Sequence, residues 1–338
     1  MKPFRKILFF GFCLALCLAG IEAYARYKVT TTPARQALDR YRPDGRPHAV
    51  FLGSSLTDAG IRADRLDSLQ AGNAHGFRSF NLALAGLSGS ANYYLLFKNF
   101  ILPRARPRYL VVEAPGVPFF PPADRFKAEG SGLRVESFRS ELMEYPDFLY
   151  LAGGFPGAVE SLSFWLHKHW LSYHYRLEIQ ARIRERFHGN QSGNGDEAAG
   201  QGPYHMAADA FARFAENTRV DLQRMEKSGD GAEAMRRKEA HLIDLAALAK
   251  AEGVRLVVLK PPCPPMDMET RMVPAFADYD RGFRALCDSL GVAYLDFSTG
   301  KSCGPYAYSD GIHLDEASAR TLTACVSGAL ASPGAEGP

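Results

Sequence analysis

The chain has 338 residues, of which 46% are hydrophobic and 23% are charged, and its formal net charge at pH 7 is +3. These proportions are ordinary for a globular protein with a sizeable core, and the length suits one large domain with an insertion or two smaller domains. A net charge this small gives no support for a surface that binds nucleic acid.

The first 25 residues have the composition of an export signal peptide or a membrane anchor. Three basic residues within the first six precede an uncharged apolar run over residues 7–21. Ala23-Tyr24-Ala25 has the small-x-small pattern that signal peptidase cleaves, but Glu22 directly before it leaves an uncleaved anchor open. Because the basic residues stay on the cytoplasmic side, both alternatives predict an exported, periplasmic or otherwise extracytoplasmic protein.

The following segment alternates predicted strands with predicted helices. Apolar runs predict strands at 49–52, 80–85 and 109–114, and helices are expected at 63–69 and 91–102. A turn rich in glycine and serine, residues 86–90, connects the second strand to the helix after it. Strands that alternate with helices indicate a parallel sheet.

This alternation stops at about residue 115. Long amphipathic segments follow a proline-rich stretch, and residues 189–202 have the glycine- and asparagine-rich composition of a flexible loop. We expect residues 121–231 to form a mainly helical insertion that caps the carboxyl edge of the sheet. Residues 26–120 and 232–330 would then be the two parts of one α/β core.

The alternation resumes after the insertion. Helices are predicted at 232–250 and 275–290, and strands at 254–259 and 292–297. A last helix should begin near Asp315, whose side chain is a good N-cap. The sequence therefore predicts an α/β fold with five parallel strands and a helical insertion after the third.

Two short motifs could supply a nucleophile and its partners. Gly53-Ser54-Ser55-Leu56-Thr57 follows the first strand, and Asp310-Gly311-Ile312-His313-Leu314 precedes the last helix. A serine needs a neutral imidazole to accept its proton, and a carboxylate on the other ring nitrogen fixes the tautomer. Open parallel sheets place such groups at the carboxyl ends of their strands, where Gly86 would add an unshielded backbone N–H for an oxyanion.

These motifs resemble those of the SGNH (GDSL-type) hydrolases. Gly53-Ser54-Ser55-Leu56-Thr57 is similar to the first block of that family, Asn81-Leu82-Ala83-Leu84-Ala85-Gly86 to the second, and Asp310-Gly311-Ile312-His313-Leu314 to the last. The resemblance covers about 49–114 and 236–328 and does not reach the insertion. It implies a flavodoxin-like three-layer sandwich.

The resemblance also implies roles for individual residues. Ser55, rather than Ser54, would be the nucleophile of a catalytic triad completed by His313 and Asp310. The backbone N–H groups of Ser55 and Gly86 would form the oxyanion hole.

The chain departs from the family at two positions. Ser54 stands where the name motif has Asp, a replacement also met in exported, membrane-associated branches. The third block usually contains an Asn that donates to the oxyanion, whereas Glu113-Ala114-Pro115-Gly116-Val117 contains none. Glu113 cannot replace it, since an ionised carboxylate only accepts. Losing such a donor costs on the order of a hundredfold in rate, so another group substitutes, the enzyme is slow, or the site is degenerate.

Together these features predict an exported serine esterase or O-acyltransferase. We expect it to act on small acyl groups, such as acetyl, of a cell-envelope or extracellular polysaccharide, with membrane association through residues 7–21. One alternative is a lipase or lysophospholipase that acts on lipid esters. A second, from another class, is a catalytically silent scaffold that uses the insertion as its partner surface. No cofactor and no nucleic-acid partner are predicted.

The cysteines and histidines do not predict a metal site. Cys263, Cys287, Cys303 and Cys325 lack C-x-x-C spacing, and His167, His169 and His174 are not three or four residues apart on a helix. In an exported chain the four cysteines are plausible disulfide partners, with three pairings open, or they are buried thiols.

Overall fold

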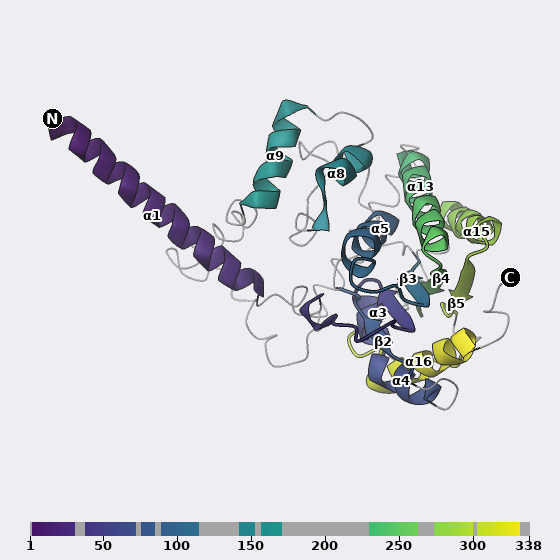
Figure 1. The fold of residues 1–338 in the computed structure, drawn as a ribbon. Helices are drawn as coiled ribbons and strands as arrows, with labels where there is room; N and C mark the ends of the chain where they lie inside the picture. Colours follow the sequence, from purple (N-terminus) through teal and green to yellow (C-terminus); the bar gives the residue numbers. More distant parts are fainter. Residues whose placement is uncertain are drawn as a thin grey trace. The chain divides into compact units, whose positions relative to one another are not determined.

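The computed structural model describes residues 2–30, 38–71, 76–84, 89–114, 142–152, 157–170, 230–262, 274–299 and 303–331 (Figure 1). Its described helices fall into two compact units. One holds α1 (Lys2–Thr30), α8 (Tyr145–Ala152) and α9 (Ala158–His169), and the other holds the sheet with its helices. The helices α8 and α9 lie within the insertion predicted from the sequence, whose boundaries stay a prediction.

The second unit is built on a five-stranded sheet in which every strand pair is parallel. The strands are β1 (Ala49–Leu52), β2 (Ser79–Asn81), β3 (Tyr109–Glu113), β4 (Arg255–Lys260) and β5 (Ala293–Asp296). Their spatial order β2-β1-β3-β4-β5 is the flavodoxin-like order. The sheet confirms the predicted fold class, and its order reverses between β1 and β3.

Helices cover both faces of the sheet (Figure 1). The helix α16 (Glu316–Ala331) packs against both α3 (Ser55–Gly60) and α4 (Ala63–Gln70). The helices α5 (Ser90–Leu96), α13 (Asp230–Ala251) and α15 (Pro274–Ser289) form the other layer, in which α13 contacts both of its neighbours. The arrangement is therefore a three-layer α/β sandwich.

Alternating strand residues form the core on the side of α4 and α16. Phe51, Val111 and Val257 come from three neighbouring strands and belong to one buried cluster with Leu322 and Val326 of α16. Successive side chains of a strand point to opposite faces, so one apolar strand supplies both layers of the core. This burial explains why β1, β3 and β4 are nearly continuous apolar runs in the sequence.

Two predicted elements differ from the observed ones. The second strand was expected over 80–85 but covers Ser79–Asn81, because the Asn81 side chain accepts a hydrogen bond from the Ala83 amide and turns the backbone. Leu82 and Leu84 still donate to the backbone of the β1 segment. The helix expected over 91–102 is α5 followed by a π-helical turn, Phe97–Ile101.

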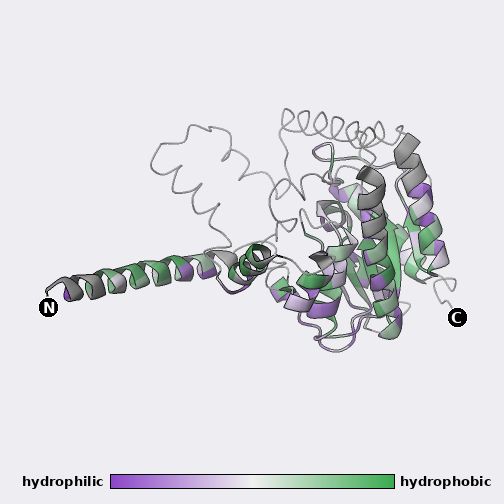
Figure 2. Cartoon of the chain, turned by 90° about the horizontal axis from the view of Figure 1, so that it is seen from above, coloured by the Kyte–Doolittle hydropathy of each residue, from purple (hydrophilic) through white to green (hydrophobic). Residues whose placement is uncertain are grey.

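The N-terminal helix α1 is apolar and exposed. Its segment Phe9–Tyr27 is long and apolar enough to cross a membrane, a test that a signal sequence also passes. Figure 2 shows hydrophobic residues along most of its length. Their side chains are mostly exposed, with Phe9, for example, 70% accessible.

One disulfide bond joins Cys303 to Cys325. Cys287 is a buried free thiol on α15, and Cys263 lies outside the described residues. Cys303 and Cys325 therefore follow the disulfide expectation, and Cys287 follows the alternative of a buried thiol.

Candidate active site

The Ser55 turn begins where β1 ends. Ser54 is the N-cap of α3 and its hydroxyl accepts from the Leu56 amide, so Ser55 is the first residue of the helix. Gly53 allows the close approach on which this turn depends. A Cβ at Gly53 would lie 2.4 Å from Thr57 Oγ1 and 2.6 Å from Glu113 Oε2. Both distances are too short for any side chain, so the position requires glycine.

In the predicted triad, the His313 ring lies within hydrogen-bonding distance of both the Ser55 hydroxyl and the Asp310 carboxylate. His313 Nε2 is 2.9 Å from Ser55 Oγ, and His313 Nδ1 is 2.7 Å from Asp310 Oδ2. The side chains of Asp310 and His313 are 1% and 10% exposed. With its proton on Nδ1, the ring can accept the hydroxyl proton of Ser55 at Nε2.

The loop that carries Asp310 and His313 is folded around the carboxylate itself. Asp310 Oδ1 accepts from the backbone N–H groups of Ile312, at 3.0 Å, and His313, at 2.7 Å. Gly311 between them has φ of 84°, which glycine adopts without strain. A bridge between Tyr308 and Leu314 closes the loop.

The environment of Asp310 favours its ionised form. Burial alone would raise the pKa of this carboxyl, but the hydrogen bonds from the amide and ring of His313 and from the Ile312 amide outweigh burial and lower it. A carboxylate that stays ionised can stabilise an imidazolium on His313.

The backbone N–H of Ser55 differs from those of its neighbours in its hydrogen bonding to the described residues. The amides of Ser54 and Thr57 donate to Glu113 and the Leu56 amide donates to Ser54 Oγ. Within the described ranges, the Ser55 amide makes no such bond. Among the described residues, nothing therefore competes for this amide with the oxyanion that forms on a substrate carbonyl oxygen when Ser55 Oγ attacks. Gly86 and Val117 lie outside the described residues.

Asn81, in the second motif, stabilises α3 from the side. Its side-chain amide donates to the carbonyl oxygens of Thr57, at 3.1 Å, and Ile61, at 2.9 Å. These carbonyls lie at the carboxyl end of a short helix, where Thr57 O also accepts from the Ile61 amide. The Asn of this motif is thus a structural brace for the Ser55 helix.

Glu113 is a site residue whose role the sequence does not reveal. It ends β3, is 3% exposed, and accepts four hydrogen bonds from Ser54 and Thr57. Burial raises the pKa of its carboxyl, and the hydrogen bonds from Thr57 and Ser54 oppose that shift. The sequence signal that could have found it is an acidic residue at the end of an otherwise apolar predicted strand.

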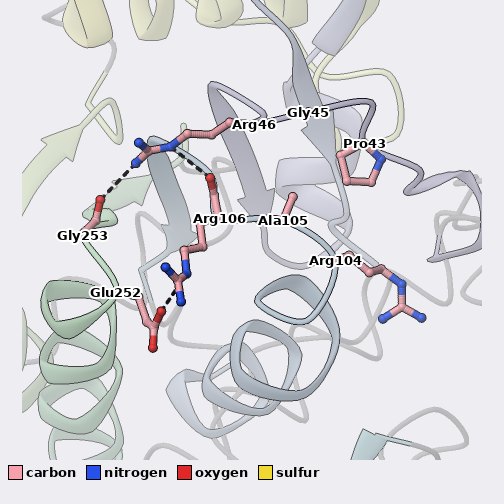
Figure 3. A pocket seen from close by; sticks show the side chains of 8 residues that line it. All are labelled: Pro43, Gly45, Arg46, Arg104, Ala105, Arg106, Glu252 and Gly253. Atoms are coloured by element: carbon pink, nitrogen blue, oxygen red, sulfur yellow. Dashed lines mark hydrogen bonds and ion pairs between the residues drawn. The ribbon is translucent and has the colours of Figure 1, made fainter.

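A hollow of about 490 Å³ lies elsewhere, near the amino ends of the strands (Figure 3). Its Arg46 donates to the backbone oxygens of Arg106 and Gly253, and Arg106 pairs with Glu252. These residues precede β1, β3 and β4, so the hollow is at the sheet edge opposite Ser55. Its arginines are bound to protein oxygens, and it holds no group that could serve as a nucleophile.

No protein-family model matches the chain, and no curated protein matches it significantly. Among solved structures it is similar to a GDSL-like lipase from Bacteroides thetaiotaomicron, with 12% identity, a TM-score of 0.40, and coverage of 91% of this chain and 98% of that one. A catalytic mutant of an acetylxylan esterase from Geobacillus stearothermophilus has 11% identity, a TM-score of 0.39, and coverage of 84% and 94%. An alpha/beta hydrolase from the metagenome of Lake Arreo, Spain, has 12% identity, a TM-score of 0.39, and coverage of 86% and 98%. Similarities this weak assign no function, which must follow from the residues of the chain itself.

Proposed function

We propose that this chain is a serine-dependent acyl ester hydrolase or O-acyltransferase of the SGNH type, with a covalent acyl group on Ser55. The observation that carries the proposal is that Ser55 Oγ, the His313 ring and the Asp310 carboxylate follow one another at hydrogen-bonding distances. Ser55 and His313 meet in this way although they are 258 positions apart in the chain. A buried serine–imidazole–carboxylate line is the arrangement that activates a hydroxyl for attack on a carbonyl.

In the first half-reaction Ser55 Oγ attacks the ester carbonyl while His313 Nε2 takes the hydroxyl proton. The charge on the tetrahedral intermediate is met by the Ser55 amide and, by prediction, the Gly86 amide. Collapse breaks the bond to the leaving alcohol, which receives the proton from His313. In the second half-reaction a water molecule or a sugar hydroxyl gives its proton to His313 Nε2 and attacks the acyl carbon. The bond from that carbon to Ser55 Oγ then breaks, and His313 returns the proton to Ser55 Oγ.

We further propose a small acyl group, such as acetyl, on a cell-envelope or extracellular polysaccharide as the substrate. The apolar N-terminal helix and the Cys303–Cys325 disulfide support a location outside the cytoplasm, where such esters occur. The exposed apolar helix equally suits an enzyme that acts on lipid esters, which is the alternative substrate class. A silent scaffold is the candidate from another class, favoured by the lack of Asn in residues 113–117.

An active-site serine probe distinguishes an enzyme from a scaffold. We expect a fluorophosphonate to label the wild-type protein and the Ser54→Ala variant, and to leave Ser55→Ala unlabelled, because only Ser55 is aligned with His313. Intact-protein mass measurement gives the stoichiometry. A wild-type protein without label, or a label that persists in Ser55→Ala, would contradict the triad.

Acceptor dependence distinguishes hydrolysis from transfer. Turnover of p-nitrophenyl acetate is followed with and without oligosaccharide acceptors, and acetylated products are identified by mass. A transferase should form acetylated oligosaccharide and release p-nitrophenol faster when the acceptor is present. Release that no acceptor changes, with acetate as the only product, identifies a hydrolase.

A further inference from the structure

Glu113 is a buried carboxyl group that the proposed chemistry does not use. It is the last residue of β3, one position beyond the register pair of Leu52 with Val112, and therefore beside the turn where β1 ends. Only 3% of it is exposed. A carboxylate costs free energy to bury unless donors surround it, so its partners indicate its role.

All four hydrogen-bond donors to Glu113 among the described residues belong to Ser54 and Thr57, which flank Ser55 and Leu56. Oε2 accepts from the Ser54 amide at 2.9 Å, the Thr57 amide at 3.2 Å and the Thr57 hydroxyl at 2.5 Å. Oε1 accepts from the Ser54 hydroxyl at 2.7 Å. One carboxylate thus holds the Ser55 turn on both of its sides.

We propose that Glu113 is a positioning residue for the nucleophile: by holding Ser54 and Thr57, it keeps Ser55 Oγ within reach of His313 and leaves the Ser55 amide unengaged. The inference rests on the proposed role of Ser55. A bidentate acceptor is suited to this task because it fixes the turn at two points with no covalent link. Misplacement of a reacting atom by about 1 Å can cost on the order of a hundredfold in rate.

Glu113 is not assigned a catalytic role. Its oxygens already accept from Ser54 and Thr57, and none of the described hydrogen bonds joins it to Ser55 or His313. It therefore acts through the turn.

Two substitutions at Glu113 separate the effect of losing its hydrogen bonds from the effect of changing its side-chain volume. In Glu113→Gln the amide oxygen can take the place of Oε2 and keep its three donors, while the amide nitrogen faces the Ser54 hydroxyl, which can accept. Glu113→Met keeps the length of the side chain and removes every acceptor. Gln70→Ala is the matched control, since Gln70 is also buried and its lost hydrogen bonds, to Ser327, tie α4 to α16 away from Ser55.

The experiment measures the rate of fluorophosphonate labelling, kcat and KM for p-nitrophenyl acetate, and the thermal midpoint of each full-length variant. We expect Glu113→Met to lower kcat and the labelling rate about a hundredfold with KM within about threefold, and Glu113→Gln to lower them by about tenfold or less. Gln70→Ala should label at the wild-type rate. Amide exchange at Thr57 should speed up in Glu113→Met, because the acceptor of that amide is lost.

Each outcome bears on a separate claim. Equal labelling rates in Glu113→Met and Gln70→Ala, measured well below both thermal midpoints, would overturn the positioning role and leave the proposed function standing. If Glu113→Met does not fold, Thr57→Val and Ser54→Ala remove one hydroxyl partner each, and labelling at the wild-type rate in both variants would overturn the inference. A wild-type protein that the probe does not label would overturn the proposed function itself, and the inference with it.

Discussion

At the scale of single residues, Asp310 combines two tasks in one carboxylate. Its Oδ1 accepts hydrogen bonds from two backbone amides and shapes the loop, and its Oδ2 is hydrogen-bonded to His313 Nδ1. Because Nδ1 must donate to this ionised oxygen, Nε2 is left as the acceptor that faces Ser55. The tautomer of the base is therefore set by the same side chain that sets the turn.

The first prediction concerns this tautomer. Asp310→Asn should lower kcat by about 10⁴, since an amide can present its NH₂ group to Nδ1 and place the ring proton on Nε2. The measurement is kcat for p-nitrophenyl acetate, with Asp64→Asn, an exposed acidic residue of α4, as the control. A loss of less than tenfold in a folded Asp310→Asn protein would contradict the assignment.

The second prediction concerns the pH dependence of stability. Because the folded protein lowers the pKa of Asp310 below its ordinary value, this carboxylate stabilises the folded state above the unfolded-state pKa of about 4. That contribution is lost as the pH falls through the lower, folded-state pKa. The difference in free energy of unfolding between wild type and Asp310→Asn should therefore shrink between pH 6 and pH 2.5, as measured by urea denaturation. A difference that grows on acidification would contradict the direction of the shift.

At the scale of elements, the loop before α16 carries two of the three proposed catalytic groups and is tied to that helix. Cys303 is bonded to Cys325 in the helix, and the Ala307 amide donates to Ser318 Oγ at 2.8 Å. Asp315 caps the helix by accepting from the Ser318 amide, also at 2.8 Å. The helix N-terminus and the proposed base are consequently positioned by the same contacts.

The third prediction follows from the disulfide. Its two cysteines are 22 residues apart, and a cross-link over a loop of that length stabilises a folded protein by about 3 kcal/mol. Replacing both Cys303 and Cys325 with Ser should lower the free energy of unfolding by about that amount. Denaturation is measured with and without reductant, which should destabilise the wild type and leave the double variant unchanged. Equal stability of both proteins without reductant would show that the bond contributes little.

At the scale of the whole sheet, strand order brings the site together. The chain goes from β1 outward to β2 and returns to β3 on the other side of β1, so the carboxyl ends of β1 and β3 are neighbours. Ser55 follows the first of these ends and Glu113 occupies the second. Packing of α16 against α3 and α4 returns the C-terminal segment to the same edge, where His313 meets Ser55.

The fourth prediction concerns the N-terminal helix. Residues 1–30 fused to a reporter that is active only outside the cytoplasm should export it, because the apolar segment Phe9–Tyr27 is long enough to enter the membrane. Leu14→Arg with Leu18→Arg should abolish export, and Leu14→Ile with Leu18→Ile is the matched control. The mass of the exported product decides between a cleaved signal and an anchor. Export that persists in the arginine variant would contradict the prediction.

The sequence alone was sufficient for features that depend on neighbours along the chain. Apolar runs and their spacing predicted the five strands, most of the helices and the fold class, with boundaries within one residue for β1, β3, β4 and β5, but the short helix α3 at Ser55–Gly60 was not predicted. The motifs around Ser55, Asp310 and His313 could also be found in the sequence, because the spacing of Asp310 from His313 is a short-range constraint, whereas the choice of Ser55 over Ser54 came from the resemblance to the SGNH hydrolases.

Tertiary structure decided the features that depend on residues far apart in the chain. The pairing of Cys303 with Cys325 and the four hydrogen bonds of Glu113 are not encoded in any local pattern. The physical reason is that a side chain's protonation, partners and role depend on what packs around it, and strand order determines which distant residues become its neighbours.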